Sequence, residues 1–443
     1  MFSHYRWLPR SRKYPISALL PTICFHRRRF FVPEIDTTEP QNPGRDPNET
    51  IVALSTFSPR VNPIPKLLEQ TSPLCAAILG RAERYDREMA SKQMSLYSRR
   101  YFMELVSLLH QRMSLALSTQ IPGARLDICG SCSSDLFTRE SDVDLSIHIP
   151  QLERNISKKN ERDRAKRIIV NLRDTLQRDF SKEFERLIAV RYARLPVLKG
   201  NFFTTMHNRK RQLTISFDVC LSNDMAVANS KLLRQYAMID RKTKSLILAV
   251  LTWAKENNIS EASLGWWSSY AWTNMAIFYL QHLGLLPNLQ CPKLIKLVGI
   301  QPNDASYIVD GLSTAFVPWD VLQSLGVWES NTDWNQMPLS IILHGFFHFY
   351  AHEFPRDHFA VSIRVGTVSL LKSTCASAKP LFYCIEDPFR VFDSPEAHDL
   401  SRPVSHIQHQ EQTIQALMHG EAYFRRLLLP NDDEMDSCAI AST

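Results

Sequence analysis

The sequence predicts an α+β protein that combines a small mixed sheet with a larger helical part. Strand-like apolar runs cluster between residues 124 and 221, and helical periodicity holds on both sides of that region. Hydrophobic residues make up 44% and charged residues 22%, which is the composition of a folded globular chain. With 443 residues, the chain has room for two or three domains of ordinary size.

The two ends of the chain are expected to lie outside this fold. Residues 1–33 hold seven basic residues and no acidic one, so the formal charge of +7 belongs to this leader and not to a nucleic-acid-binding surface. The leader fits either a mitochondrial transit peptide or a disordered basic tail. Residues 33–66 read as an extended Pro-rich linker, so that 1–66 precede the fold, and residues 429–443 read as an acidic tail.

Cysteine usage and hydropathy indicate a reducing compartment and no membrane partner. Nine cysteines are irregularly spaced, which argues against a secreted disulfide framework and leaves a cytoplasmic or mitochondrial location open. The uncharged stretch 268–286 carries Asn274 and Gln281 among other polar residues, so we expect a buried core helix there.

The elements are expected in a definite order. Helices fill 67–117, and strands follow at 126–129, 143–149, 187–195 and 213–221, with a charged helix at 158–180. Further helices are expected at 225–239, 243–257, 268–283 and 339–353, and 301–338 are expected to be irregular. This order predicts a catalytic domain at 118–224, a helical domain formed by 67–117 and 225–428, and a cleft between them.

Acidic residues at two strands carry the chemical argument. Side chains alternate along a strand, so Asp142 and Asp144 point to the same face. Asp218 lies in an otherwise apolar strand, where an unpaired carboxylate is costly. If the two strands are neighbours, the three carboxylates converge and can hold two Mg²⁺ or Mn²⁺ ions, the arrangement used for phosphoryl and nucleotidyl transfer.

A Gly-Ser turn precedes these acids and fits a phosphate cradle. Gly130 allows close backbone approach, and Ser131 offers a hydroxyl and an N–H group. Simpler interpretations exist, because an isolated Asp-x-Asp is usually a solvated strand edge and Gly-Ser is common in turns. Cys129 and Cys132 could form a redox pair or half a zinc site, but no second Cys-x-x-Cys accompanies them.

Together these motifs resemble the DNA polymerase β-like nucleotidyltransferase superfamily. Within it, the chain is similar to template-independent terminal uridylyltransferases and poly(A) polymerases with a PAP-associated domain, over about residues 85–410. The resemblance is carried by Gly130-Ser131, Asp142-x-Asp144 and Asp218, and by further motifs in the helical part. These are Asp218–Asn223, Ala228–Leu233, Trp253–Lys255, Leu264–Tyr270, Gly345–Ala351, Ser362–Arg364, Glu386–Phe389 and His398–Arg402.

The resemblance implies a role for each matching residue. Asp142, Asp144 and Asp218 would bind the metal ions and carry catalysis. Gly130, Ser131, Lys255 and Ser269 would contact the triphosphate, Asn223 and Asn229 would lie by the nucleotide, and Tyr270 would stack on the base. His398 matches the histidine that favours uracil over adenine in the uridylyltransferases of this family; without the motif, a lone loop histidine would read as solvent-exposed.

Some positions depart from the family pattern. Leu251 replaces a lysine usual four residues before Lys255, and Asp135 replaces a glycine common after the Gly-Ser turn. The segment 390–397 is longer than usual before His398, and Arg390 replaces an acid.

The function predicted is addition of UMP from UTP to an RNA 3′ end without a template. One alternative is a poly(A) polymerase that uses ATP, and another is a catalytically weak RNA-binding scaffold with the same fold. Basic residues on the helix at 158–180 and at Asn208–Arg211 could follow an RNA backbone or be solvated surface. No RNA-recognition motif is evident, so a protein partner could direct RNA choice.

Overall fold

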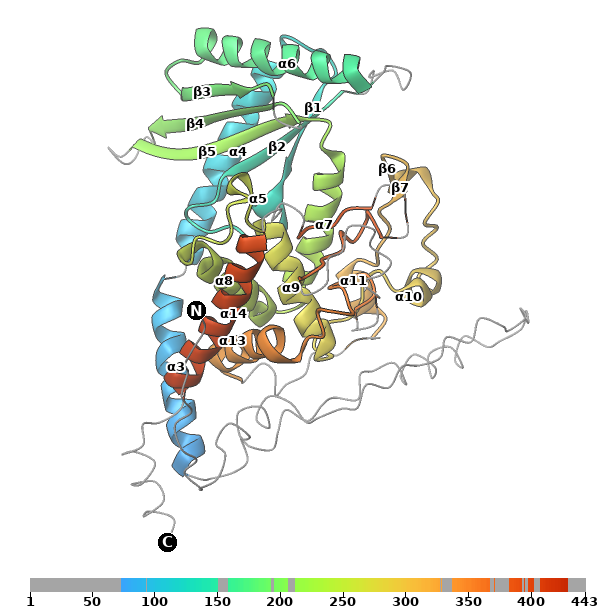
Figure 1. Ribbon diagram of the computed structural model, residues 1–443. Coiled ribbons are helices and arrows are strands. Elements are labelled where there is room, and N and C mark those ends of the chain that lie inside the picture. Colours follow the sequence, from blue (N-terminus) through green and yellow to red (C-terminus); the bar gives the residue numbers. More distant parts are fainter. Residues whose placement is uncertain are drawn as a thin grey trace, which may run out of the picture.

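The computed structural model describes residues 73–428 except 93, 150–157, 193–194, 206–211, 327, 329–336, 367–369, 371–381, 393, 395–396 and 402–406. The predicted leader, linker and acidic tail therefore lie outside the described residues, as do Asn208–Arg211 and Arg402. In Figure 1 a sheet with helical cover lies above a helical part, as the α+β prediction requires.

The sheet has five strands in the order β1-β2-β5-β4-β3. Strands β2 and β5 are parallel, while β1–β2, β4–β5 and β3–β4 are antiparallel. The parallel pair forms because the long connection between β2 and β5 includes a helix and two further strands, which gives the chain room to cross over. The bounds are β1 Arg125–Cys129, β2 Val143–His148, β3 Phe184–Val190, β4 Val197–Thr205 and β5 Gln212–Leu221.

Three expected strands are confirmed and one was wrong in part. The strand expected at 187–195 begins earlier and ends at Val190, and β4 was not predicted. Lys199, Gly200 and Asn201 interrupt its apolar pattern, and residues of this kind have low strand propensity. Tertiary packing explains Gly200, because a Cβ there would lie 2.6 Å from Leu187 Cδ2 and 2.9 Å from Phe217 Cζ.

Two helices complete the core of the sheet domain. Helix α6 (Lys158–Asp179) contributes Ile169 and Leu172, and helix α4 (Leu96–Ser118) contributes Val106 and Leu109, all of them fully buried in one cluster with the sheet. The predicted boundaries assign α4 to the helical domain, whereas its packing puts it with the sheet. The domain boundaries otherwise stay a prediction.

The helical part contains the remaining long helices. Those expected at 225–239, 243–257 and 268–283 are confirmed within two residues, and the helix expected at 339–353 continues as a π-helical turn from Phe349. Short α10 was not predicted, and 301–338, expected to be irregular, contains α11, β6 and β7. The bounds are α3 Pro73–Lys92, α7 Asp224–Ile239, α8 Arg241–Glu256, α9 Ser269–His282, α10 Pro292–Leu297, β6 Ile308–Val309, β7 Leu312–Ser313, α11 Trp319–Ser324, α13 Leu339–His348, the π-helical turn Phe349–Glu353 and α14 Ile407–Leu428.

Helix α9 is the centre of the helical core. Every residue from Ala271 to Gln281 is buried, which confirms the core helix expected from its uncharged sequence. The buried Gln281 amide donates to Tyr236 Oη (2.9 Å) and to the Ile363 carbonyl (3.0 Å). Hydrogen bonds of this kind offset the cost of burying a polar side chain. Among the described residues no helix is long and apolar enough to cross a bilayer.

Asp135 joins the two parts of the molecule. Its carboxylate pairs with Arg99 on α4 (2.5 Å) and with Lys244 on α8. Burial acts to raise the pKa of Asp135, but hydrogen bonds from Lys244 and Arg99 outweigh this and lower it. The backbone at Asp135 is left-handed (φ 61°), a conformation that favours glycine, and its carboxylate bridges the sheet domain and the helical part.

Candidate active site

The parallel pairing of β2 and β5 brings the three predicted acids together. Asp144 and Asp218 are Cα partners in the register of these strands, and Asp142 lies two residues before Asp144, on the same face. All three line one cleft of about 750 Å³ between the sheet and the helical part. The convergence expected from sequence alternation is therefore found in the structure.

Burial and neighbouring carboxylates raise the pKa of two of these acids, Asp142 and Asp144. Burial, followed by the charges of Asp218 and Asp142, raises the pKa of Asp144 to about 7. Burial and the Asp218 charge also raise the pKa of Asp142. Carboxylates repel each other in this way until a cation lies between them, so the site is electrostatically suited to positive charge.

Lys199 on β4 is a site residue that sequence reasoning missed. Its ammonium lies 2.5 Å from Asp218 Oδ2, because β4 pairs with β5 and Lys199 is the Cα partner of Asp218. Burial acts to lower the pKa of Lys199, but Asp218, Asp142 and Asp144 raise it overall. The observed register is centred between residues 208 and 209. The predicted tip at Asn208–Arg211 is centred one residue later and would have placed Lys199 opposite Cys220 instead of Asp218.

Gly130 packs tightly against the side chain of Asp144. A Cβ at this position would lie 2.0 Å from Asp144 Oδ2, and the backbone has a left-handed φ of +64°. The Gly130 amide donates to Ser230 Oγ on α7 at 2.8 Å. The expected Gly-Ser turn is the start of a single helical turn, α5 (Gly130–Ser134), which carries Ser131 into the cleft.

The donor set fits divalent cations. Three carboxylates gather on one wall, an ammonium already lies against one of them, and the glycine beside Asp144 has no room for a side chain. Carboxylate oxygens are the ligands that Mg²⁺ and Mn²⁺ prefer.

The opposite wall of the cleft comes from the helical part. Every predicted nucleotide-binding residue except His398 lies on the cleft lining, together with the acids. Leu251 lies there too, so an apolar side chain occupies the position where the family usually has lysine. The residues that converge from the helical part are Asn223, Asn229, Lys255, Ser269 and Tyr270.

Two of these side chains carry polar atoms without a hydrogen-bond partner among the described residues. Asn229 Oδ1 and Tyr270 Oη are both buried and make no such bond. Buried polar atoms normally have partners, so such atoms facing a cleft are candidates for contacts with a ligand. Burial and the Asp387 charge raise the pKa of Tyr270 well above its usual value, which keeps the phenol neutral.

His398 does not line the cleft, but it contacts Asp387 and Arg390, whose charges act on Tyr270. Its Nδ1 is 3.3 Å from Asp387 Oδ2, and its backbone amide donates to the Arg390 carbonyl (3.0 Å). Arg390 itself pairs with Asp310 at 3.7 Å. The loop before His398 is held by the buried Glu386, which accepts a hydrogen bond from the Phe392 amide and another from Arg364 Nη2 at 2.9 Å.

The structure does not support a redox role for Cys129 and Cys132, and it weakens the interpretation of helix α6 as an RNA-binding surface. Cys129 and Cys132 are free and buried, and burial, followed by the Asp144 charge, raises the pKa of both thiols, that of Cys132 to about 12, so neither is a reactive thiolate. On α6, Lys166, Arg173 and Arg178 pair with neighbouring aspartates, which reduces the positive charge of that helix.

Two domain families match the chain. The family "Poly(A) RNA polymerase, mitochondrial-like, central palm domain" matches residues 87–238, and "Cid1 family poly A polymerase", the PAP-associated domain, matches residues 338–391. Together the two matches identify a poly(A) polymerase-like central palm domain and a PAP-associated domain in this chain. The central match includes α4, the five strands and α7, and therefore the whole acidic wall of the cleft.

Individual relatives of this family are moderately similar. Poly(A) RNA polymerase GLD2 of Danio rerio is 30% identical over 62% of this chain and 51% of its own length. Terminal uridylyltransferase cid1 of Schizosaccharomyces pombe is 26% identical over 77% of this chain and 76% of its own. The chain thus spans about half the length of the Danio rerio GLD2 protein. A crystal structure of the Cid1 poly(U) polymerase has the same fold (TM-score 0.58, 23% identity, 77% of this chain and 92% of that one).

Solved structures of Cid1 with this fold include complexes with nucleotides. One is with the UTP analogue UMPNPP (TM-score 0.58, 24% identity), one with Mg and 3′-dATP (0.57, 23%) and one with the short product ApU (0.59, 22%). These ligands are those of Cid1.

Proposed function

We propose that the protein adds nucleoside monophosphates to RNA 3′ ends without a template, with UTP as its preferred substrate. The observation that carries this proposal is the convergence of Asp142, Asp144 and Asp218 on a cleft whose other wall holds Lys255 and Tyr270. A nucleotide in the cleft would contact both parts of the molecule.

In this proposal the three acids hold two divalent ions, Mg²⁺ or Mn²⁺. When bound, such ions supply charge neutralisation of the triphosphate and a lower pKa for the attacking hydroxyl. Asp218 is also the residue proposed to help activate the RNA 3′-hydroxyl. Lys199, 2.5 Å from Asp218 Oδ2, is proposed to balance the acids before the ions bind.

The nucleotide would be held by the other cleft residues. Lys255, an exposed cation on the lining, and the hydroxyls of Ser131 and Ser269 are proposed to bind the triphosphate, with the Gly130 backbone leaving space for it. Asn223 and Asn229 are proposed to contact the nucleotide, with the orphan Oδ1 of Asn229 near the ribose 2′-hydroxyl. Tyr270 would stack on the base, which any nucleobase permits.

The choice of UTP over ATP depends on the proposed base reader, His398. Asp387 holds its Nδ1 at 3.3 Å and thereby fixes the direction of the ring. The second candidate, ATP, is favoured by the 30% identity to a protein named poly(A) RNA polymerase. A partner protein that selects the RNA would be compatible with either choice.

Purified protein incubated with a short RNA, Mg²⁺ and each of the four triphosphates tests the proposal. UTP is expected to give the longest tails. Longer tails with ATP would instead support the alternative that the protein is a poly(A) polymerase. No extension with any triphosphate, under conditions where the protein is folded, would favour the catalytically weak scaffold.

The base reader has its own test. Replacing His398 by Ala or Asn is expected to lower the ratio of UTP to ATP incorporation by about tenfold, since the ring that would exclude the larger base is lost. His358→Ala, at an exposed histidine away from the loop, is the matched control and should leave the ratio unchanged. An unchanged ratio in both variants would remove His398 from base selection.

A further inference from the structure

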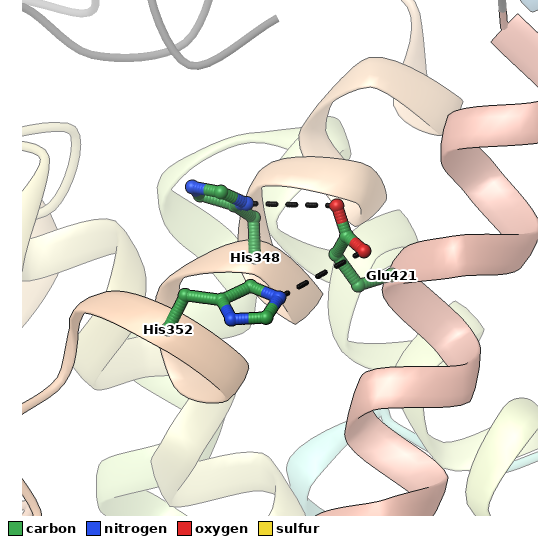
Figure 2. Close-up of side chains that lie close together, drawn as sticks. All are labelled: His348, His352 and Glu421. Atoms are coloured by element: carbon green, nitrogen blue, oxygen red, sulfur yellow. Dashed lines mark ion pairs between the residues drawn. The ribbon is translucent and has the colours of Figure 1, made fainter. Parts of the chain in front are cut away.

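A second cluster of titratable side chains lies outside the cleft, where α14 packs on α13. His344, His348 and His352 follow at four-residue spacing along α13 and its π-helical continuation, and residues at this spacing share one helix face. Figure 2 shows His348 and His352 directed at the carboxylate of Glu421, which comes from α14. π-Helical turns are rare and often occur at functional sites.

The two helices approach closely at this point. A Cβ on Gly420 would lie 2.9 Å from Phe347 Cδ1, so this glycine lets α14 lie against α13. The next residue, Glu421, is consequently buried (4% exposed) beneath the three histidines. Its Oε1 lies 3.4 Å from His344 Nε2 and 3.6 Å from His348 Nδ1, and its Oε2 lies 3.8 Å from His352 Nε2.

The histidines of this cluster have unmet bonding capacity. His344 is 1% exposed, and among the described residues neither of its ring nitrogens has a hydrogen-bond partner; the same holds for His348 Nδ1. Nitrogens buried without partners are uncommon in folded proteins, and a bound ion is one way in which such atoms are satisfied. Each of these rings lies against the same carboxylate.

Ion pairing alone does not account for the cluster. Arg425 already donates to Glu421 Oε1 through Nε (2.9 Å) and Nη2 (2.5 Å). The guanidinium therefore already balances the charge of Glu421 without help from the histidines. In its neutral form each imidazole ring has the lone pair that a metal ion requires.

The ligand geometry is close to that of a metal site. One ligand atom from each of His348, His352 and Glu421 lies within 4.8 Å of the other two. Bonds of about 2 Å to a tetrahedral Zn²⁺ need somewhat shorter separations. His352, with 42% of its side chain exposed, has room to rotate inward. If His348 binds through Nδ1, its Nε2 faces Glu353 Oε1 at 3.5 Å, the carboxylate support that metal-bound histidines commonly have.

We propose that His348, His352 and Glu421 bind one Zn²⁺ ion, with water as the fourth ligand, and that this ion fastens α14 to the PAP-associated domain. Two imidazoles and one carboxylate form a ligand set that zinc favours over Mg²⁺. His344 and Arg425 are positioning residues that hold Glu421 in place. The site is independent of the nucleotide chemistry, since none of its residues lines the cleft.

Zinc titration of the chelator-stripped full chain tests the proposal, with excess Mg²⁺ present to occupy the acidic cleft. Calorimetry should give one Zn²⁺ per chain, and Co²⁺ should give the intense visible absorption of a tetrahedral site. His352→Ala should weaken Zn²⁺ binding at least about 100-fold and abolish the rise in melting temperature on adding Zn²⁺. Because His352 is partly exposed, this variant should fold without the metal.

The controls distinguish a specific zinc site from non-specific zinc binding by exposed histidines. His358→Ala removes an exposed histidine outside the cluster and should leave Zn²⁺ affinity unchanged. Glu421→Gln keeps the shape of the side chain and should also weaken binding, without the Co²⁺ absorption. Absence of Zn²⁺ binding, equal affinity of His352→Ala and the parent, or equal losses in His352→Ala and His358→Ala would each overturn the proposal.

Discussion

Two buried carboxylates, Asp144 in the cleft and Glu421 between α13 and α14, have pKa values that are shifted in opposite directions. In the cleft, burial and neighbouring acids raise the pKa of Asp144 to about 7. Between α13 and α14, burial acts on Glu421 in the same sense, but His344 and Arg425 outweigh it and lower its pKa to about 2. Both side chains are removed from water, so the neighbours decide the sign.

This difference indicates what each cluster can bind. The cleft presents several oxygens with excess negative charge and one nearby ammonium, which suits hard divalent ions and a triphosphate. The helical cluster presents imidazole nitrogens around a carboxylate that is already neutralised, which suits a metal with nitrogen affinity.

Removing an acid of the cleft should have the largest effect. Asp144→Ala or Asp218→Ala is expected to lower RNA extension by at least about 1,000-fold while the protein stays folded, because the ions lose a ligand. Primer-extension rates and circular dichroism measure the two quantities. Asp127→Ala, at a β1 carboxylate paired with Arg125 outside the cleft, is the control. Rates within a few-fold of the parent in Asp144→Ala would contradict the role of the acids.

Adding one methyl group beside the acids should come next. Gly130→Ala is expected to lower extension about 100-fold, since its Cβ would displace the Asp144 carboxylate, and a misplacement of about 1 Å costs this much. Gly123→Ala is a matched control, because Gly123 also has positive φ (+81°) but no atom within 4 Å of its Cβ position. Both variants carry the strain of a positive φ, but only Gly130→Ala adds a clash with Asp144, so only this variant should lose activity. Equal activity in the two would refute the crowding argument.

The two clusters should respond oppositely to pH. The folded-state pKa of Asp144 is raised, so this group destabilises the metal-free fold as pH rises from about 4 through about 7. The folded-state pKa of Glu421 is lowered, so its stabilisation is present above pH 4 to 5 and is lost as pH falls toward about 2. In melting curves without metal, Asp144→Asn should reduce the fall in melting temperature between pH 5 and 8. Glu421→Gln should leave the fall in melting temperature over this pH range unchanged. The same slope in Asp144→Asn and the parent would contradict this assignment.

The smallest effect is expected at Lys199. Lys199→Met removes a cation that competes with divalent ions for Asp218, so Mg²⁺ binding without nucleotide should tighten a few-fold. The lost ion pair is half exposed and should change the free energy of unfolding by less than about 1 kcal/mol. Lys166→Met, which breaks an exposed pair on α6, should not change Mg²⁺ affinity. Weaker Mg²⁺ binding in Lys199→Met would mean that the ammonium supports the ions instead.

The acidic wall of the cleft could be predicted because its residues follow local rules, whereas the residues of the opposite wall were predicted only from the family resemblance. Strand alternation puts Asp142 and Asp144 on one face, and the apolar surroundings of Asp218 single it out. The helices expected at 158–180, 225–239, 243–257 and 268–283 were predicted within two residues, whereas α14 was not predicted as a separate helix. The prediction failed at β4, where Lys199, Gly200 and Asn201 break the strand pattern and only pairing with two neighbouring strands forms the element.

Side-chain spacing along a strand or helix is a local property, so the amino-acid order was enough to show which acids could share a face and which segments are helical. Packing in three dimensions was needed to place Lys199 against Asp218, to join the sheet domain to the helical part through Asp135, and to bury Glu421 under the three histidines. These contacts join residues distant in the chain. Strand register and the close approach of helices form them, and neither is encoded in the spacing of any one segment.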